Sequence, residues 1–212
     1  MAQRLVQKVQ SPALPIPTGG PLKPYLDALN NILRLFFNLL SSAVNSVVGE
    51  YGGRFIEFPN AKFFSTVDQT ASVVDTAYAL QFENTYLGEA ISIVGTQITP
   101  LYSGVYNFEL SVELTSTNAN SKELSFWVRR SGVDIANTGR MHVVSGSGGV
   151  DDFEYSFTLD LTAGQYVELM WATDDTGITI DYQAAASPRP AVPSTLLTVV
   201  FVSAVPETLP TP

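Results

Sequence analysis

The sequence predicts a mainly β protein, an antiparallel β-sandwich that follows an extended N-terminal arm and one long α-helix. Three observations support this fold class. After residue 53, apolar residues recur at every second position in many short runs, which is the period of strands that bury one face. Clusters of Gly, Asn, Asp and Ser separate these runs at intervals that suit a sandwich. A helical period occurs only from residue 21 to about residue 48.

We divide the 212 residues into an arm at 1–21, a helical stalk or anchor at 22–53 and a β domain at 54–212. Four prolines and a Gly-Gly pair in residues 1–21 prevent a helix and favour an extended chain. The apolar residues between the prolines indicate an arm that lies on a surface. A disordered terminus is the alternative.

Residues 21 to about 48 have the apolar pattern of a helix, and glycines at positions 49, 52 and 53 provide its end. Apolar side chains follow one another at alternating spacings of four and three, the heptad pattern of a helix that packs on copies of itself. The predicted seam consists of Leu22, Leu26, Leu29, Leu33, Phe36, Leu40, Ala43 and Val47. Further apolar residues beside the seam indicate burial on several sides, as in a trimer or against a host surface. Packing along its own domain is the alternative.

The predicted strands follow from alternating apolar residues between turn clusters. They are residues 54–58, 62–65, 77–82, 90–94, 104–117, 123–129, 140–144, 152–161, 165–173, 177–182 and 195–203. The most regular is 104–117, in which Tyr106, Phe108 and Leu110 share one face. Residues 195–203 are apolar on both faces, which predicts a central or intersubunit strand.

The formal net charge of −9 argues against nucleic acid as a partner, because phosphate backbones attract Lys and Arg. Residues 1–54 nevertheless carry five basic residues against two acidic ones, and the remainder carries six against eighteen. A basic arm before an acidic body suits docking onto an acidic protein surface, and a solvated tail is the alternative. The sequence has neither the apolar core of a secretion signal nor a run able to span a bilayer.

The residues that carry chemistry are few. The absence of cysteine and the single histidine, His142, exclude thiolate catalysis and any site with two His ligands. Asp174 and Asp175, with Asp181 nearby in sequence, could offer oxygen ligands to Ca²⁺, and solvated turn carboxylates are the alternative. We therefore expect no enzymatic activity and no cofactor.

Trp127 is predicted to point outward from its strand, beside Arg129 and Arg130. A tryptophan with arginine neighbours is a common anchor of protein interfaces. Packing beneath a neighbouring loop is the alternative.

Two segments, 104–108 (GVYNF) and 161–169 (LTAGQYVEL), resemble the jelly roll shared by the complement globular head and the tumour necrosis factor superfamily. The resemblance covers residues 75–203 and includes an apolar closing strand at 196–202. It implies a threefold assembly with apolar and aromatic residues at its axis. The candidates for the trimer axis are Tyr106, Phe108, Tyr166 and Phe201. The chain lacks the collagen-like stalk and cysteines of the animal family, so that family's immune partners have no support here.

Residues 24–38 and 187–199 are similar to segments of small virion proteins from tailed phages. This resemblance implies a non-enzymatic virion protein, made in the host cytoplasm and then part of the virion. It would act as a homotrimer whose arm and helix bind capsid or tail components. A capsid decoration or head fibre is favoured slightly over a tail fibre. The alternatives are a tail receptor- or carbohydrate-binding protein that recognises host surface glycans, and a soluble bacterial binding protein unrelated to phages.

Overall fold

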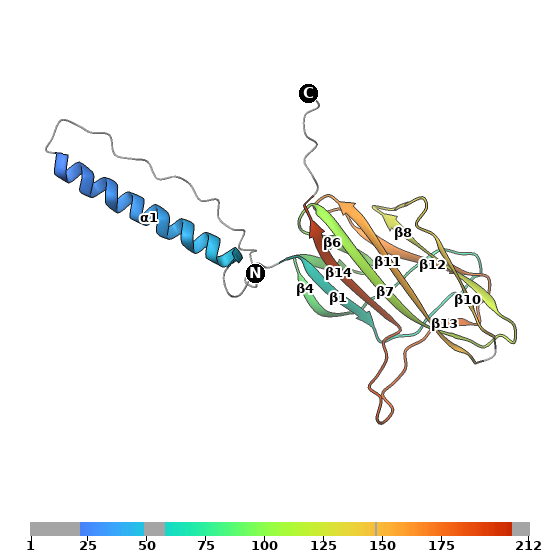
Figure 1. Ribbon diagram of the computed structural model, residues 1–212. Coiled ribbons are helices and arrows are strands. Elements are labelled where there is room, and N and C mark those ends of the chain that lie inside the picture. Colours follow the sequence, from blue (N-terminus) through green and yellow to red (C-terminus); the bar gives the residue numbers. More distant parts are fainter. Residues whose placement is uncertain (1–21, 49–57, 147, 205–212) are drawn as a thin grey trace. The chain divides into compact units, whose positions relative to one another are not determined.

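The computed structural model of the protein describes residues 22–48, 58–146 and 148–204, except the side chains of residues 23 and 45–48. The chain divides into two compact units, Met1–Glu57 and Phe58–Pro212, and each is described by itself. The described part of the first unit is one helix, and the second unit is a β-sandwich (Figure 1). The predicted arm, the end of the predicted stalk and most of the strand predicted at 54–58 lie outside the described residues.

Helix α1 spans Leu22–Val48. Pro24 lies in its first turn, where a missing N–H removes no helical hydrogen bond. No glycine and no further proline follow within the helix, so its backbone can continue without interruption. In the described part of the chain, no helix is long and apolar enough to cross a membrane.

Sheet A is antiparallel and is built around one long strand, β7. Its strands are β1 (Asn60–Ser65), β2 (Gln69–Thr70), β4 (Asn84–Glu89), β7 (Gly104–Ser116), β11 (Val150–Leu161), β13 (Ile178–Ile180) and β14 (Thr195–Ser203). β7 pairs with β11 over most of its length and also with β13 and β14. β1 then joins β14 to β4.

Sheet B is also antiparallel, with the strand order β10-β8-β12-β6-β5. Its strands are β3 (Tyr78–Ala79), β5 (Ile91–Val94), β6 (Gln97–Pro100), β8 (Lys122–Arg130), β9 (Val133–Asp134), β10 (Arg140–Val144) and β12 (Val167–Thr173). β3 pairs with β12, and β9 pairs with β8. The chain changes sheet between β7 and β8, between β10 and β11, and again on either side of β12. These crossings give a jelly-roll sandwich, so the predicted fold class is confirmed.

The core lies between the two sheets, because alternate residues of each strand point inward. The inward-facing apolar residues of β7 that follow Gly104 are at most 3% exposed. Aromatic rings connect the sheets at the β11 side: Phe126 stacks on Phe153 with ring centroids 4.3 Å apart. Within sheet A, Phe157 of β11 stacks on Phe108 of β7 at 4.9 Å. Each fully buried large side chain of this kind stabilises the fold by about 1.5–3 kcal/mol.

Candidate interaction surfaces

α1 presents the apolar seam that its sequence predicts. All six seam leucines and phenylalanines are exposed or only partly buried: Leu22, Leu26, Leu29, Leu33, Phe36 and Leu40. Leu22 is 70% exposed, and Leu33 and Leu40 are each 36% exposed. The side chain of Val47, the last predicted member, lies outside the described residues. The seam therefore has surface available to a partner.

The apolar surface of α1 is wider than the seam. With Leu26, Leu33 and Leu40 at heptad position a, the flanking e and g positions are also apolar in the second half of the helix. These flanking residues are Ile32, Phe37, Leu39 and Val44. Asn31 and Asn38, seven residues apart, lie on the opposite side of the helix. A two-stranded coiled coil buries mainly positions a and d, so apolar e and g positions favour three or more helices.

The residues predicted for a trimer axis do not lie together on the surface. Tyr106 and Phe108 are 0% and 1% exposed, because the chain's own two sheets enclose them. The prediction that these two rings meet neighbouring subunits is therefore corrected. Phe201 of β14 is partly buried and packs edge-to-face on Tyr106, with ring centroids 5.6 Å apart. Tyr166 lies elsewhere, just before β12 of sheet B, where its carbonyl accepts the Ser131 N–H.

Trp127 lies on the outer face of sheet B but is partly buried. It pairs across the strands with Met170, which is only 3% exposed. Hydrogen bonds from the Arg129 guanidinium and from Trp127 lower the pKa of Asp134 on β9. Arg129 Nε lies 2.7 Å from Asp134 Oδ1, and Arg130 reaches Asp160 of β11. These contacts within one chain favour the packing alternative over an interface anchor.

The turn carboxylates also have partners within the chain. The Asp175 carboxylate accepts the Gly177 N–H and the Asn118 amide, each at 2.7 Å, and forms an ion pair with Lys122 at 3.2 Å. The hydrogen bond from the Gly177 N–H, and to a smaller extent the contact with Lys122, holds the pKa of Asp175 below its ordinary value. Asp174 accepts a backbone N–H of β8 at 2.9 Å. Among the described residues, no group of three or more His, Asp or Glu side chains could hold a metal ion.

His142 belongs to the edge of the sandwich. Its Nε2 lies 3.1 Å from Asp151 Oδ2, and its ring lies 5.5 Å from the ring of Phe153. His142 is on β10 of sheet B, whereas Asp151 is on β11 of sheet A. The contact therefore joins the two sheets.

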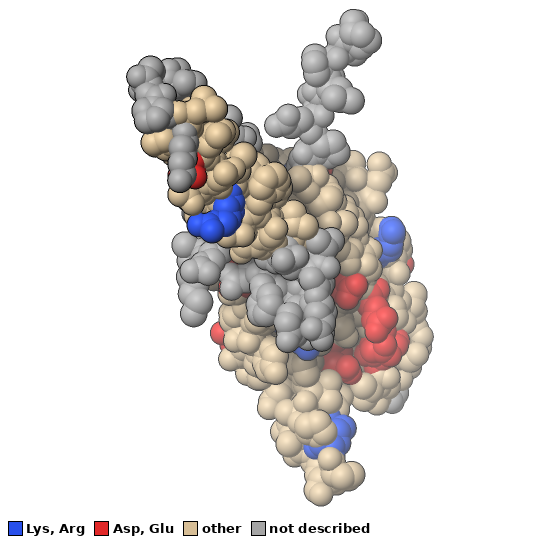
Figure 2. Space-filling model, turned by 60° about the vertical axis from the view of Figure 1, so that its left-hand side comes forward, with Lys and Arg blue, Asp and Glu red and all other residues tan. Residues whose placement is uncertain are grey.

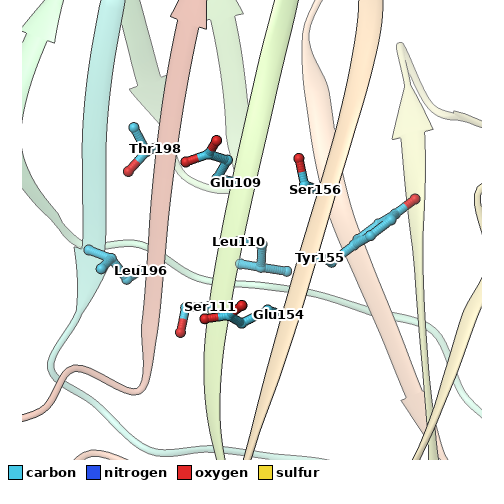
Figure 3. A pocket seen from close by; sticks show the side chains of 8 residues that line it. All are labelled: Glu109, Leu110, Ser111, Glu154, Tyr155, Ser156, Leu196 and Thr198. Atoms are coloured by element: carbon cyan, nitrogen blue, oxygen red, sulfur yellow. The ribbon is translucent and has the colours of Figure 1, made fainter.

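A groove of about 510 Å³ crosses β11, β7 and β14 on the outer face of sheet A, a feature that the sequence did not predict (Figure 3). Its lining consists of Glu109, Leu110, Ser111, Glu154, Tyr155, Ser156, Leu196 and Thr198. Strand register places Ser111 between Leu196 and Glu154. In the next row, Glu109 lies between Thr198 and Ser156. Because the side chains of Leu110 and Tyr155 are buried in the core, the groove offers carboxylates and hydroxyl groups beside the aliphatic side chain of Leu196.

Four carboxylates of β7 and β11, Glu109, Glu113, Asp152 and Glu154, form what we call the acidic ribbon. Asp152 lies directly opposite Glu113. In the described part of the chain, none of the four forms an ion pair with a Lys, Arg or His side chain. Figure 2 shows acidic side chains gathered on one side of the sandwich. Burial raises the pKa of Glu113, and the charges of Asp152 and Asp181 raise it further. This surface therefore favours a cationic partner.

Comparison of the chain with protein-family models and with curated proteins finds no match.

Proposed function

We propose that this protein is a non-enzymatic structural component of a phage particle that works as a homotrimer. α1 joins the three chains and, with the arm, attaches them to the capsid or tail, and the sandwich is the projecting body. A capsid decoration or head fibre is favoured over a tail fibre, because these 212 residues contain no shaft repeats.

One observation carries the proposal: α1 exposes apolar side chains at heptad spacing on a stripe that includes the flanking e and g positions. Phe37 and Leu39 are each 57% exposed. Contact between apolar side chains and water is unfavourable, so burial of these two residues between neighbouring helices would stabilise the assembly. A helix that rests on an irregular protein surface has no need of a regular seven-residue repeat. The repeat therefore favours other copies of α1 as the partner.

The assignment to a virion is supported by the phage-like segments at 24–38 and 187–199. Affinity for a particle would come from three linked copies and from apolar burial.

The trimer is tested by light scattering on the full chain. We expect about three times the chain mass of 22.9 kDa for the natural protein and a single-chain mass for a Leu33→Asp/Leu40→Asp variant, because buried carboxylates are costly. The matched control, Asn31→Asp/Asn38→Asp, adds the same two charges on the polar side and should remain trimeric. A natural protein of single-chain mass would contradict the proposal.

The virion assignment is tested with particles of the phage that encodes the chain. Antibodies to the sandwich should label the particles in electron micrographs, and particles assembled with the Leu33→Asp/Leu40→Asp chain should lose the label. In a separate assay, free protein is added to host cells before infection by normal particles. If the free protein blocks infection by occupying the host surface, the receptor- or glycan-binding alternative replaces this proposal.

A further inference from the structure

We propose that the acidic ribbon on sheet A is a docking surface for an extended peptide with two basic residues four positions apart, and that this peptide is residues 1–9 of a second copy of the chain. The second copy is the neighbour in the proposed homotrimer, so the inference rests on that assembly. The contact would add a charged link between chains to the apolar contact of their helices.

The surface has an acidic–neutral–acidic pattern along β7. Glu109, Ser111 and Glu113 all point away from the core, because they alternate with the buried residues of the strand. Residues four positions apart on a strand are separated by about 13 Å. The neighbouring strand β11 adds Glu154 beside Ser111 and Asp152 beside Glu113. Negative charge thus extends along the outer surface of two paired strands.

The N-terminal sequence MAQRLVQKV has the complementary pattern. It contains Arg4 and Lys8 and no acidic residue. In an extended peptide, residues 4, 6 and 8 share one side, and positions 4 and 8 are also about 13 Å apart. Arg4, Val6 and Lys8 can therefore lie over Glu109, Ser111 and Glu113 in either direction. Val6 would then contact Leu196, the aliphatic side chain that lies beside Ser111 in the groove.

The electrostatics of the ribbon favour such an occupant. Burial raises the pKa of Glu113, the charges of Asp152 and Asp181 raise it further, and within the sandwich the opposing effect comes from Arg189. A second cation over Glu113 would relieve this repulsion and lower its pKa. Because the surface is open to solvent, salt should weaken the contact.

The test uses a mixture of ¹⁴N- and ¹⁵N-labelled full-length chains treated with a carbodiimide, which joins an amine to a carboxylate in direct contact. We expect Lys8 of one label linked to Glu109, Glu113, Asp152 or Glu154 of the other. The yield should fall sharply at about 1 M salt, where the screening length is about 3 Å.

The matched control exchanges two neighbours in the arm, Gln7→Lys with Lys8→Gln, which keeps composition and charge but moves one cation to the other side of an extended chain. We expect a lower yield from the relocated lysine, by up to about fivefold, the upper end of the factor for one exposed ion pair. On the body, Glu109→Gln/Glu113→Gln should lower the link from Lys8 to the remaining ribbon carboxylates. Glu123→Gln on sheet B should not.

The inference is overturned if Lys8 links only within its own chain, only to carboxylates outside the ribbon, or equally well from position 7. Light scattering of the same samples separates the two proposals. A trimer without the link removes this inference alone, whereas a single-chain mass removes the proposed assembly as well.

Discussion

Gly104 begins β7 at a place where another side chain needs the space of a Cβ atom. The ring of Phe201 lies against the Gly104 backbone, and the carbonyl oxygen of Ser203 lies 3.0 Å from where a Cβ would be. Phe201 is held on its other side by Tyr106, whose hydroxyl donates to the Tyr102 carbonyl at 2.7 Å. The close approach of β14 to the start of β7 therefore depends on glycine at this position.

Gly104→Ala should lower the free energy of unfolding by about 1–3 kcal/mol, the usual cost of adding a methyl group to a well-packed site. Urea denaturation measures the change. Gly139→Ala is the control, because a Cβ at that exposed position meets no atom within 4 Å. Equal midpoints for the two variants would show that the Phe201 ring can move aside at no cost.

The same residues show a limit of sequence patterns. Alternation correctly predicted that Tyr106 and Phe108 share one face of a strand. It could not tell whether that face meets the chain's own second sheet or a neighbouring subunit, because both bury aromatic residues equally well. Their burial within the single chain, where Tyr106 is 0% and Phe108 1% exposed, decides the question in favour of the core.

The connection between β13 and β14 is an element with its own internal order. It protrudes from the sandwich (Figure 1). Its backbone pairs at Gln183 with Val192 and at Ala186 with Arg189. Arg189 also donates to the carbonyls of Ala184 and Pro190. Residues 184–191 are all exposed, so this connection contributes little burial to the core.

Replacing residues 184–191 with two glycines should therefore leave the sandwich folded. The pair Gln183–Val192 remains, and a two-residue turn can close an antiparallel pair of this kind. We expect the unfolding temperature to change by no more than a few degrees, because the removed residues bury little apolar surface. A scanning calorimeter measures it. Loss of the cooperative transition would mean that the connection supports the sheet.

Strands were predicted well where alternation was clear and poorly where it was absent. β7 and β11 alternate over more than ten residues and were predicted nearly to their ends. β4 was not predicted, because four of its six residues are exposed and its edge position needs no apolar face. β6 was also missed, since it is only four residues long and ends at Pro100. The strand predicted at 77–82 holds only for Tyr78–Ala79, the part that pairs with β12.

At the scale of the whole molecule, the composition predicts the excess of acidic residues but not where they gather. The net charge of −9 is visible in the composition. The acidic ribbon arises only when β7 and β11 pair with Asp152 opposite Glu113, although three strands of sheet B lie between β7 and β11 in the chain order. The groove likewise needs β14, far along the chain, beside β7. Register between distant strands is what the sequence pattern leaves open.

The acidic ribbon also predicts a pH dependence of stability. The pKa of Glu113 is raised above its ordinary value of 4.5 by burial and by Asp152 and Asp181. The folded state therefore prefers the protonated form of Glu113. Its contribution to stability is present below the ordinary pKa and is lost as the pH rises through the raised value. At neutral pH the ionised Glu113 is a cost to the sandwich as long as no basic residue of another chain lies over the ribbon.

Glu113→Gln should consequently raise the free energy of unfolding at pH 7 by a few tenths of a kcal/mol, the scale of one partly exposed charge interaction. The gain should vanish near pH 3, where Glu113 is protonated and resembles glutamine. Urea denaturation of both proteins across this range measures it. Glu123→Gln, which removes an exposed charge from sheet B, is the control for net charge. A gain of equal size in the control, or one that persists at pH 3, would show that the effect does not come from repulsion within the ribbon.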